Sequence, residues 1–219
     1  MSTITLVRHG QANTSAQDEL SYDNLSDLGR QQAQWLGDHL NATGEHFERV
    51  YCGTLRRHIQ TAEGMRAQSY AEIIQDPRLN EMEFFTLAKL LLDQQGISLP
   101  DSREAFVTYM PMLLAKWEAG EIQNPPESFQ DFEGRVWDAI LDIDNGRGPS
   151  LVVTSGGLIG MCFRQAMGLN VTTFSRTCMA IMNTSMHRLH RIGTDLSMTQ
   201  FNAIPHLDRP DRQFAQTHL

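Results

Sequence analysis

An arginine, a histidine and a glycine stand side by side near the N-terminus, at Arg8, His9 and Gly10. They directly follow the apolar run Ile4–Val7, which predicts a strand buried on both faces. In open α/β sheets, ligands bind beyond the carboxyl ends of the strands. At that place the guanidinium could hold a phosphate through two parallel hydrogen bonds, and the imidazole could act as a nucleophile. The glycine would let the backbone approach a ligand closely.

Three further blocks follow along the chain: residues 53–62 (GTLRRHIQTA), residues 79–83 (LNEME) and residues 154–157 (TSGG). Their order resembles that of the histidine phosphatase superfamily, which includes the phosphoglycerate mutases. The family pattern is an Arg-His-Gly after the first strand, then Ser-x-Leu-x-Arg-Ala-x-Gln-Thr, then Leu-x-Glu, and finally His-Gly-Gly after a late strand. The resemblance covers nearly the whole chain apart from residues 85–131, and four blocks in order are far more specific than one.

The resemblance implies a role for each matching residue. His9 would attack phosphorus and form a phosphohistidine, while Arg8 and Arg57 would hold the phosphoryl oxygens. The position directly after Leu-x selects Glu81 as the general acid that protonates the leaving alcohol, with Glu83 as its rival. An incoming phosphate dianion raises a carboxyl pKa in the direction that this role needs. Gln11 would either add an amide contact to phosphate or only satisfy the backbone of its own loop.

Ser155 departs from the family pattern, because it stands where the second catalytic histidine is expected. The same sequence is similar to a bacterial branch of the family that has Thr-Ser-Gly-Gly here. A serine hydroxyl donates one hydrogen bond but brings no charge, and loss of one donor to an anionic transition state costs about a hundred- to a thousandfold in rate. Two hypotheses remain open. Either the site lacks this charge, and Ser155→His should raise turnover, or His58 or His206 has replaced it, and Ser155→His should crowd the site.

Three functions are therefore compatible with the motif residues. The first is a phosphomonoester phosphatase that works through a phosphohistidine. The second is a catalytically weakened phosphoester-binding protein, a pseudophosphatase that keeps the pocket. The third and weakest is a phosphoglycerate mutase, because the segment 85–130 is acidic and a mutase binds a polyanion.

The amino-acid composition and net charge exclude some classes of binding partner. A net charge of −8 and a pI of about 5.4 argue against binding to nucleic acid or to anionic membranes. The expected partner is a small-molecule phosphoester or phosphate, without a cofactor or metal. The chain contains three cysteines, an odd number that suggests reduced thiols. With no signal peptide or membrane span recognisable in the sequence, we expect a cytoplasmic protein.

Alternating strand and helix patterns predict an α/β fold, a three-layer α/β/α sandwich with a mainly parallel sheet. A single histidine-phosphatase-like domain is expected over residues 1–219, with residues 85–131 inserted as a helical cap. Apolar runs predict strands at 4–7, 47–52, 73–74, 151–154, 186–189 and 196–202, and helices at 26–39, 57–68 and 158–167. Residues 11–24 are predicted to form a loop, and the polar tail from Asp208 is expected to be frayed.

Overall fold

The computed structural model describes residues 3–218, which fold around a single six-stranded sheet. Its order is β3-β2-β4-β1-β5-β6, formed by β1 (Thr3–Arg8), β2 (Arg49–Cys52), β3 (Ile73–Gln75), β4 (Ser150–Thr154), β5 (Met186–Ile192) and β6 (Asp195–Ala203). The first four strands pair in parallel, whereas β5 and β6 run antiparallel to their neighbours. The predicted α/β architecture with a mainly parallel sheet is confirmed.

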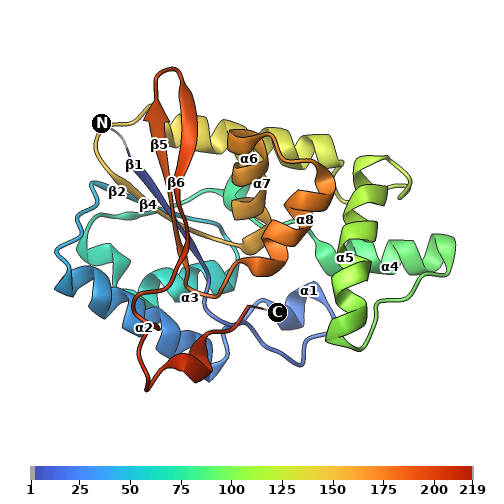
Figure 1. The fold of residues 1–219 in the computed structure, drawn as a ribbon, viewed down its shortest axis with the longest axis horizontal. Coiled ribbons are helices and arrows are strands. Elements are labelled where there is room, and N and C mark those ends of the chain that lie inside the picture. The colour runs from blue at the N-terminus through green and yellow to red at the C-terminus, as the bar shows by residue number, and fades with distance from the viewer. Residues whose placement is uncertain (1–2, 219) are drawn as a thin grey trace.

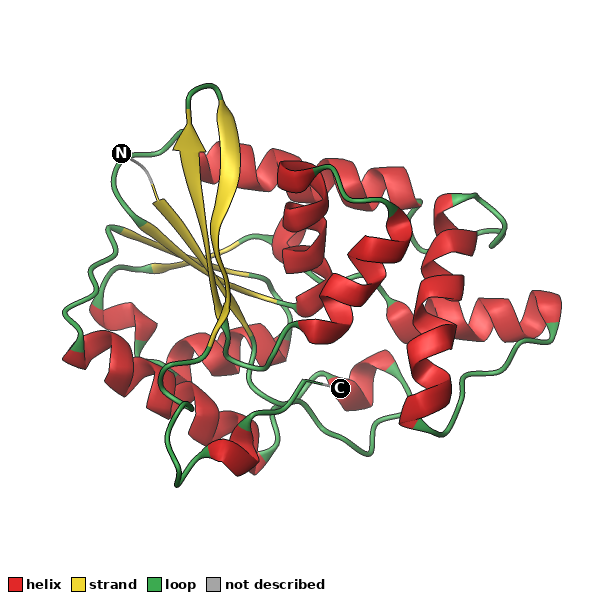
Figure 2. Ribbon diagram, in the orientation of Figure 1, coloured by secondary structure: helices red, strands yellow, loops and turns green. Residues whose placement is uncertain are grey.

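Helices cover both faces of this sheet (Figures 1 and 2). One face carries α2 (Asp27–Ala42) and α3 (Arg56–Gly64), and the other carries α6 (Phe129–Asp144), α7 (Gly156–Met167) and α8 (Val171–Ala180). Two more helices, α4 (Phe84–Gln95) and α5 (Arg103–Glu118), extend beyond the end of the sheet. Short helical turns complete the described elements: α1 (Glu19–Tyr22), η1 (Ala67–Ser69), η2 (Pro77–Leu79) and η3 (Gln213–Ala215).

The two faces of the sheet explain the unbroken apolar runs in the sequence. Leu6 and Val152 belong to the core under α6 and α7, while Val7 and Val153 belong to the core under α2 and α3. Successive residues of one strand therefore enter opposite cores, so every position of the run is buried. Because β1, β2 and β4 run parallel, their carboxyl ends lie at the same edge of the sheet. At that edge the backbone N–H of His9 donates to the carbonyl of Thr154 (2.8 Å).

Two expectations about irregular segments are wrong. Residues 11–24 contain the short helix α1, which Asp18 caps by accepting from the N–H of Ser21. The C-terminal tail is packed rather than frayed, since Ala215 is fully buried and the Gln32 amide donates to its carbonyl (2.7 Å). This tail reaches the carboxyl edge of the sheet, where the site described below lies (Figure 1). Within residues 3–218, no helix combines the length and apolar character needed to span a bilayer.

Candidate active site

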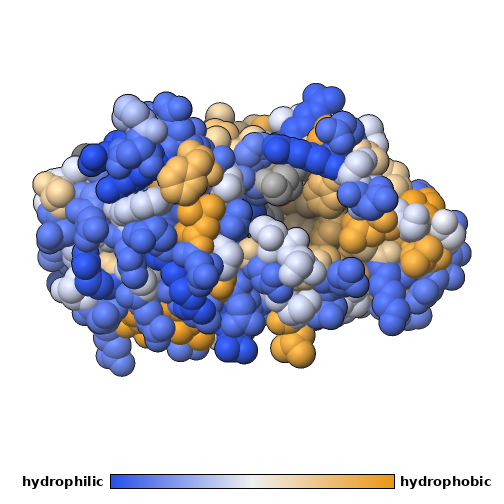
Figure 3. All heavy atoms as spheres, turned by 90° about the horizontal axis from the view of Figure 1, so that it is seen from below, coloured by the Kyte–Doolittle hydropathy of each residue, from blue (hydrophilic) through white to orange (hydrophobic). Residues whose placement is uncertain are grey.

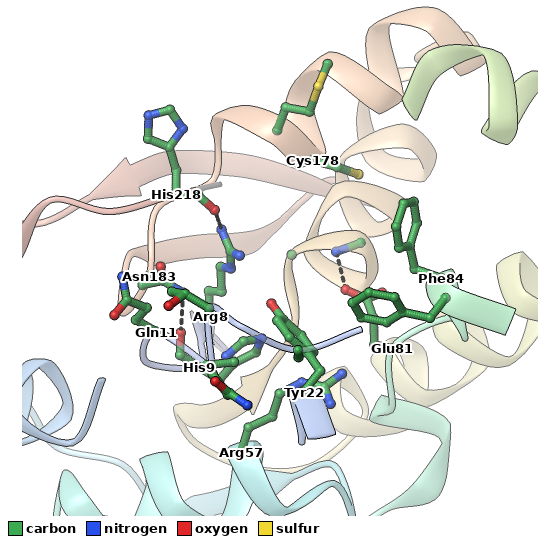
Figure 4. Close-up of a pocket in the computed structure, with 18 of the residues that line it drawn as sticks. Arg8, His9, Gln11, Tyr22, Arg57, Glu81, Phe84, Cys178, Asn183 and His218 are labelled. Carbon is green, nitrogen blue, oxygen red and sulfur yellow. Dashed lines mark hydrogen bonds between the residues drawn. The ribbon is translucent and has the colours of Figure 1, made fainter. Parts of the chain in front are cut away.

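A cavity of about 470 Å³ opens at the carboxyl edge of the sheet, and five of the six predicted site residues line it: Arg8, His9, Gln11, Arg57 and Glu81. Figure 4 shows these side chains around one space, although they come from β1, the loop after it, α3 and the segment after η2. Gly156 and Gly157, at the start of α7, also line the cavity. The structure therefore brings the four sequence blocks together.

His9 is held in one orientation at the floor of the cavity. Its Nδ1 donates to the carbonyl of Gly10 (2.7 Å), since a carbonyl can only accept. In the neutral ring this leaves the lone pair on Nε2. Burial lowers the pKa of His9 well below its ordinary value, and the guanidinium groups of Arg57 and Arg8 lower it further. The ring is therefore neutral at physiological pH, which is the form that can attack an electrophile.

Arg8 ends β1 with its guanidinium almost fully buried. Its Nη1 donates to the carbonyls of Ile181 and His218, the latter at 2.9 Å, while its Nε is buried without a hydrogen-bond partner in the described structure. An unpartnered buried donor is costly, and an anion in the cavity would satisfy it.

Arg57 approaches from the first turn of α3 and is 2% exposed. Its Nη1 forms an ion pair with Asp23 Oδ1 (3.0 Å), and its guanidinium carbon lies 5.1 Å from the centre of the Tyr22 ring. These contacts hold the guanidinium against the cavity, and its Nε has no partner among the described residues. The neighbouring Arg56 is exposed, so the two adjacent arginines differ sharply in environment.

Glu81 places its carboxylate inside the cavity, where Oε2 accepts from the N–H of Gly157 (2.7 Å) and Oε1 from that of Met82 (3.1 Å). Removal from water raises the pKa of Glu81, although these hydrogen bonds and the two arginines oppose the rise. Glu83, its rival from the sequence, is exposed, accepts from the Thr86 hydroxyl (2.9 Å) and does not line the cavity.

Ser155 and His58 lie beneath the cavity floor and do not line it. Both are fully buried, and Ser155 Oγ lies 2.6 Å from His58 Nε2. Burial lowers the pKa of His58, so its ring is neutral. His58 therefore stands against Ser155 in the interior, 5.7 Å from the His9 ring. His206, the other alternative, bonds the Thr184 hydroxyl (2.8 Å) and does not line the cavity.

Gln11 lines the cavity, but its Oε1 already accepts from the Ser26 hydroxyl (2.8 Å). The sequence did not point to Tyr22, Asn183 or the tail residues Thr217 and His218, which also line the cavity. Asn183 donates to the carbonyl of His9 (3.2 Å), a contact across 174 positions that no local pattern signals.

No cluster of three or more histidine, cysteine, aspartate or glutamate side chains suited to a metal ion occurs within residues 3–218. All three cysteines are buried and free, as the odd count suggested.

Comparison with known proteins agrees with this geometry. The chain is similar to a probable phosphoglycerate mutase GpmB from Enterobacter sp. (strain 638), with 27% identity over 96% of this chain and 97% of the relative. In fold it resembles a phosphoserine phosphatase from Entamoeba histolytica in complex with phosphoserine (TM-score 0.70, 18% identity, 94% and 100% of the two chains). It also resembles the mycobacterial glucosyl-3-phosphoglycerate phosphatase (TM-score 0.64, 23% identity, 92% and 98% of the two chains). The model of the histidine phosphatase superfamily (branch 1) matches residues 4–204, so the chain belongs to this superfamily.

Proposed function

We propose that the protein is a phosphatase that hydrolyses a small phosphomonoester through a phosphohistidine intermediate on His9. The observation that carries the proposal is the meeting of three groups in one cavity. These are the unprotonated Nε2 of His9 and the guanidinium groups of Arg8 and Arg57, each with a buried nitrogen that lacks a partner in the described structure. Two such donors facing one nucleophile suit a phosphoryl group.

In the first step, the lone pair on His9 Nε2 forms a bond to phosphorus while the bond from phosphorus to the ester oxygen breaks. Arg8 and Arg57 hold the equatorial oxygens, where negative charge is concentrated. Glu81 transfers its proton to the departing alcohol oxygen, which its raised pKa favours.

In the second step, a water oxygen bonds to phosphorus and the bond to His9 breaks. Glu81, now a carboxylate, accepts the proton of that water, so that the products are the alcohol and inorganic phosphate. The N–H of Gly157 orients the Glu81 carboxylate in both steps. In this proposal residues 85–131 form a helical cap, since Phe106 and Met110 of α5 line the cavity. Three free cysteines suit a reducing compartment such as the cytoplasm.

Ser155 supports a second candidate, the pseudophosphatase that binds phosphoesters without turning them over. The buried serine contributes no charge at the position where the family pattern has histidine, and it does not line the cavity. The mutase relatives support the third candidate, but Glu19 adds an acidic side chain to the cavity, which disfavours a polyanionic substrate.

The test is to trap the intermediate. The protein is mixed with p-nitrophenyl phosphate, quenched in base and digested, and peptides are searched for an acid-labile phosphate. We expect it on the peptide that holds His9, and we expect His9→Ala to abolish both label and turnover. His46→Ala is the matched control, because His46 is exposed. Turnover that survives His9→Ala would refute the mechanism, whereas thermal stabilisation by phosphate without turnover would identify the binding protein.

A further inference from the structure

We propose that the preferred substrates are monoesters of uncharged, apolar alcohols, and that a second anionic group on the substrate is selected against. This inference rests on the proposed phosphatase activity and adds the class of its substrate. It is drawn from the part of the cavity that lies beyond the phosphate-binding groups.

An aromatic wall leads from the nucleophile to the mouth of the cavity. The Tyr22 ring lies 6.3 Å from His9 in an edge-to-face arrangement and 5.7 Å from Phe85. Phe84 continues the wall, 5.7 Å from Phe85 on one side and 5.7 Å from Phe106 of α5 on the other. All of these side chains line the cavity. Rings packed in this way are fixed by one another, and so present a preformed apolar surface to the alcohol.

The space-filling view agrees with this description. Figure 3 shows the molecule hollowed on one face, with tan and orange residues along one side of the hollow and blue and white residues around the rest of its rim. The cavity of about 470 Å³ is within the size range that accommodates small organic ligands, so room for an alcohol remains beside the phosphoryl group.

The charges in the cavity oppose a second anion. Among the described residues that line it, Arg8 and Arg57 are the arginine and lysine side chains, and both belong to the phosphate end. Arg57 is also paired with Asp23. A carboxylate on the substrate would therefore be desolvated against aromatic rings without a cation of its own.

Glu19 adds a negative group to the same region. It lines the cavity, and its Oε1 accepts from the N–H of Phe85 (2.7 Å), which holds it beside the aromatic wall. Burial raises the pKa of Glu19, and the charges of Glu81 and Glu83 add to the rise, while the Phe85 hydrogen bond and Arg57 favour the ionised form. Its repulsion acts on anionic substrates and leaves uncharged alcohols unaffected.

Two synthetic esters with the same linker test the inference: phenylpropyl phosphate and carboxypropyl phosphate. Both release a primary alcohol of similar basicity, so their rates differ through binding at the far end and not through the leaving group. We expect kcat/KM for the phenyl ester to exceed that for the carboxylate ester by about tenfold or more, from burial of the ring alone. The non-hydrolysable phosphonates of both compounds, titrated by calorimetry, should show the same order of affinity.

Two variants test which residues of the cavity cause the preference for the phenyl ester. Phe106→Ala should raise KM for the phenyl ester, and Glu19→Gln should narrow the ratio between the two esters, because the amide keeps the contact with Phe85 without the charge. Phe214→Ala is the matched control, since Phe214 lies 70% exposed outside the cavity.

The outcomes distinguish a wrong substrate class from a wrong activity. Hydrolysis of the carboxylate ester as fast as the phenyl ester, and dependent on His9, would overturn the substrate class while leaving the phosphatase intact. Absence of turnover for both esters would refute the proposed phosphatase activity. The affinities of the two phosphonates would then show whether the cavity prefers the phenyl or the carboxylate ligand. Equal affinities would overturn the inference, and tighter binding of the phenyl phosphonate would support it.

Discussion

Ser155→His is the perturbation that most directly tests how the buried pair beneath His9 works. The family pattern has alanine at position 58 and histidine at position 155, whereas this chain has His58 and Ser155. Their side chains are 2.6 Å apart and fully buried, so the ring of His58 occupies the room next to residue 155. We infer that the imidazole has moved from one side of this pair to the other. The ring of His58 also lies 5.7 Å from that of His9, so a displacement of His58 would disturb the nucleophile.

The magnitudes follow from that geometry. A second imidazole at position 155 must displace the first, and overpacking of a buried site costs about 1–3 kcal/mol of stability. Misplacement of a reacting group by about 1 Å can cost about a hundredfold in rate. We therefore expect Ser155→His to lower turnover by about tenfold or more and to lower the melting temperature. Adding His58→Ala to Ser155→His makes room for the new ring, and should raise turnover by about tenfold or more above Ser155→His alone, a difference of about 1.4 kcal/mol between these two variants.

The assay is a double-mutant cycle with kcat measured for the parent, the two single variants and the double variant. Circular dichroism confirms that each variant is folded, and thermal melts separate loss of structure from loss of catalysis. The reasoning is refuted if Ser155→His alone raises turnover, because a second imidazole would then be accommodated without displacing His58. It is equally refuted if the two effects simply add, since residues in contact must couple.

Three other outcomes are expected. Inorganic vanadate should raise the melting temperature of the parent and of Arg56→Ala but not of Arg57→Ala, because Arg57 lines the cavity and Arg56 does not; an undiminished shift in Arg57→Ala would count against the site. The raised pKa of Glu81 should make kcat fall as pH rises through that pKa, and Glu81→Gln should remove this limb along with most of the activity; an unchanged pH profile would exclude Glu81 as the acid. Burial lowers the pKa of His187 and of His206 to about 3, so the unfolded state binds more protons below about pH 6.5 and stability falls as pH drops; each should cost about 1.4 kcal/mol of unfolding free energy from pH 7.5 to 5.5, and denaturant titrations that show no loss would refute this.

The strands and the four motif blocks were predictable because their signals are local. An apolar run such as Leu151–Val153 has no exposed position, and only a strand between two helical layers buries all of it. The start of α2 also depends on a local contact, since the Ser26 hydroxyl accepts from the N–H of Gly29 three residues later (3.0 Å). Arg8 and His9 could be predicted at a strand end for the same reason, because the apolar run directly before them is a local signal.

Other parts of the site depend on contacts between distant residues and could not be predicted. The partner of Ser155 is His58, 97 positions away, and nothing in either segment alone signals the pairing. The prediction of a frayed tail was wrong for the same reason. Its polar sequence gives no sign that Gln32 donates a hydrogen bond to the carbonyl of Ala215, or that Arg8 donates one to the carbonyl of His218. The helix α1 is only four residues long, too short for any hydrophobic period to show.

The contact between the tail and Arg8 also has a consequence for how the molecule is made. Arg8 leaves the ribosome well before its partner, because the carbonyl of His218 lies 210 positions later in the chain. Domains generally begin to fold from the N-terminal part during synthesis, and contacts of such separation form late. The sheet cannot close around β1 until β4 and β5 are made, and the cavity wall formed by Thr217 and His218 comes later still. A nascent chain that has not yet reached His218 therefore carries an incomplete cavity, with the Arg8 guanidinium still lacking one of its carbonyl partners.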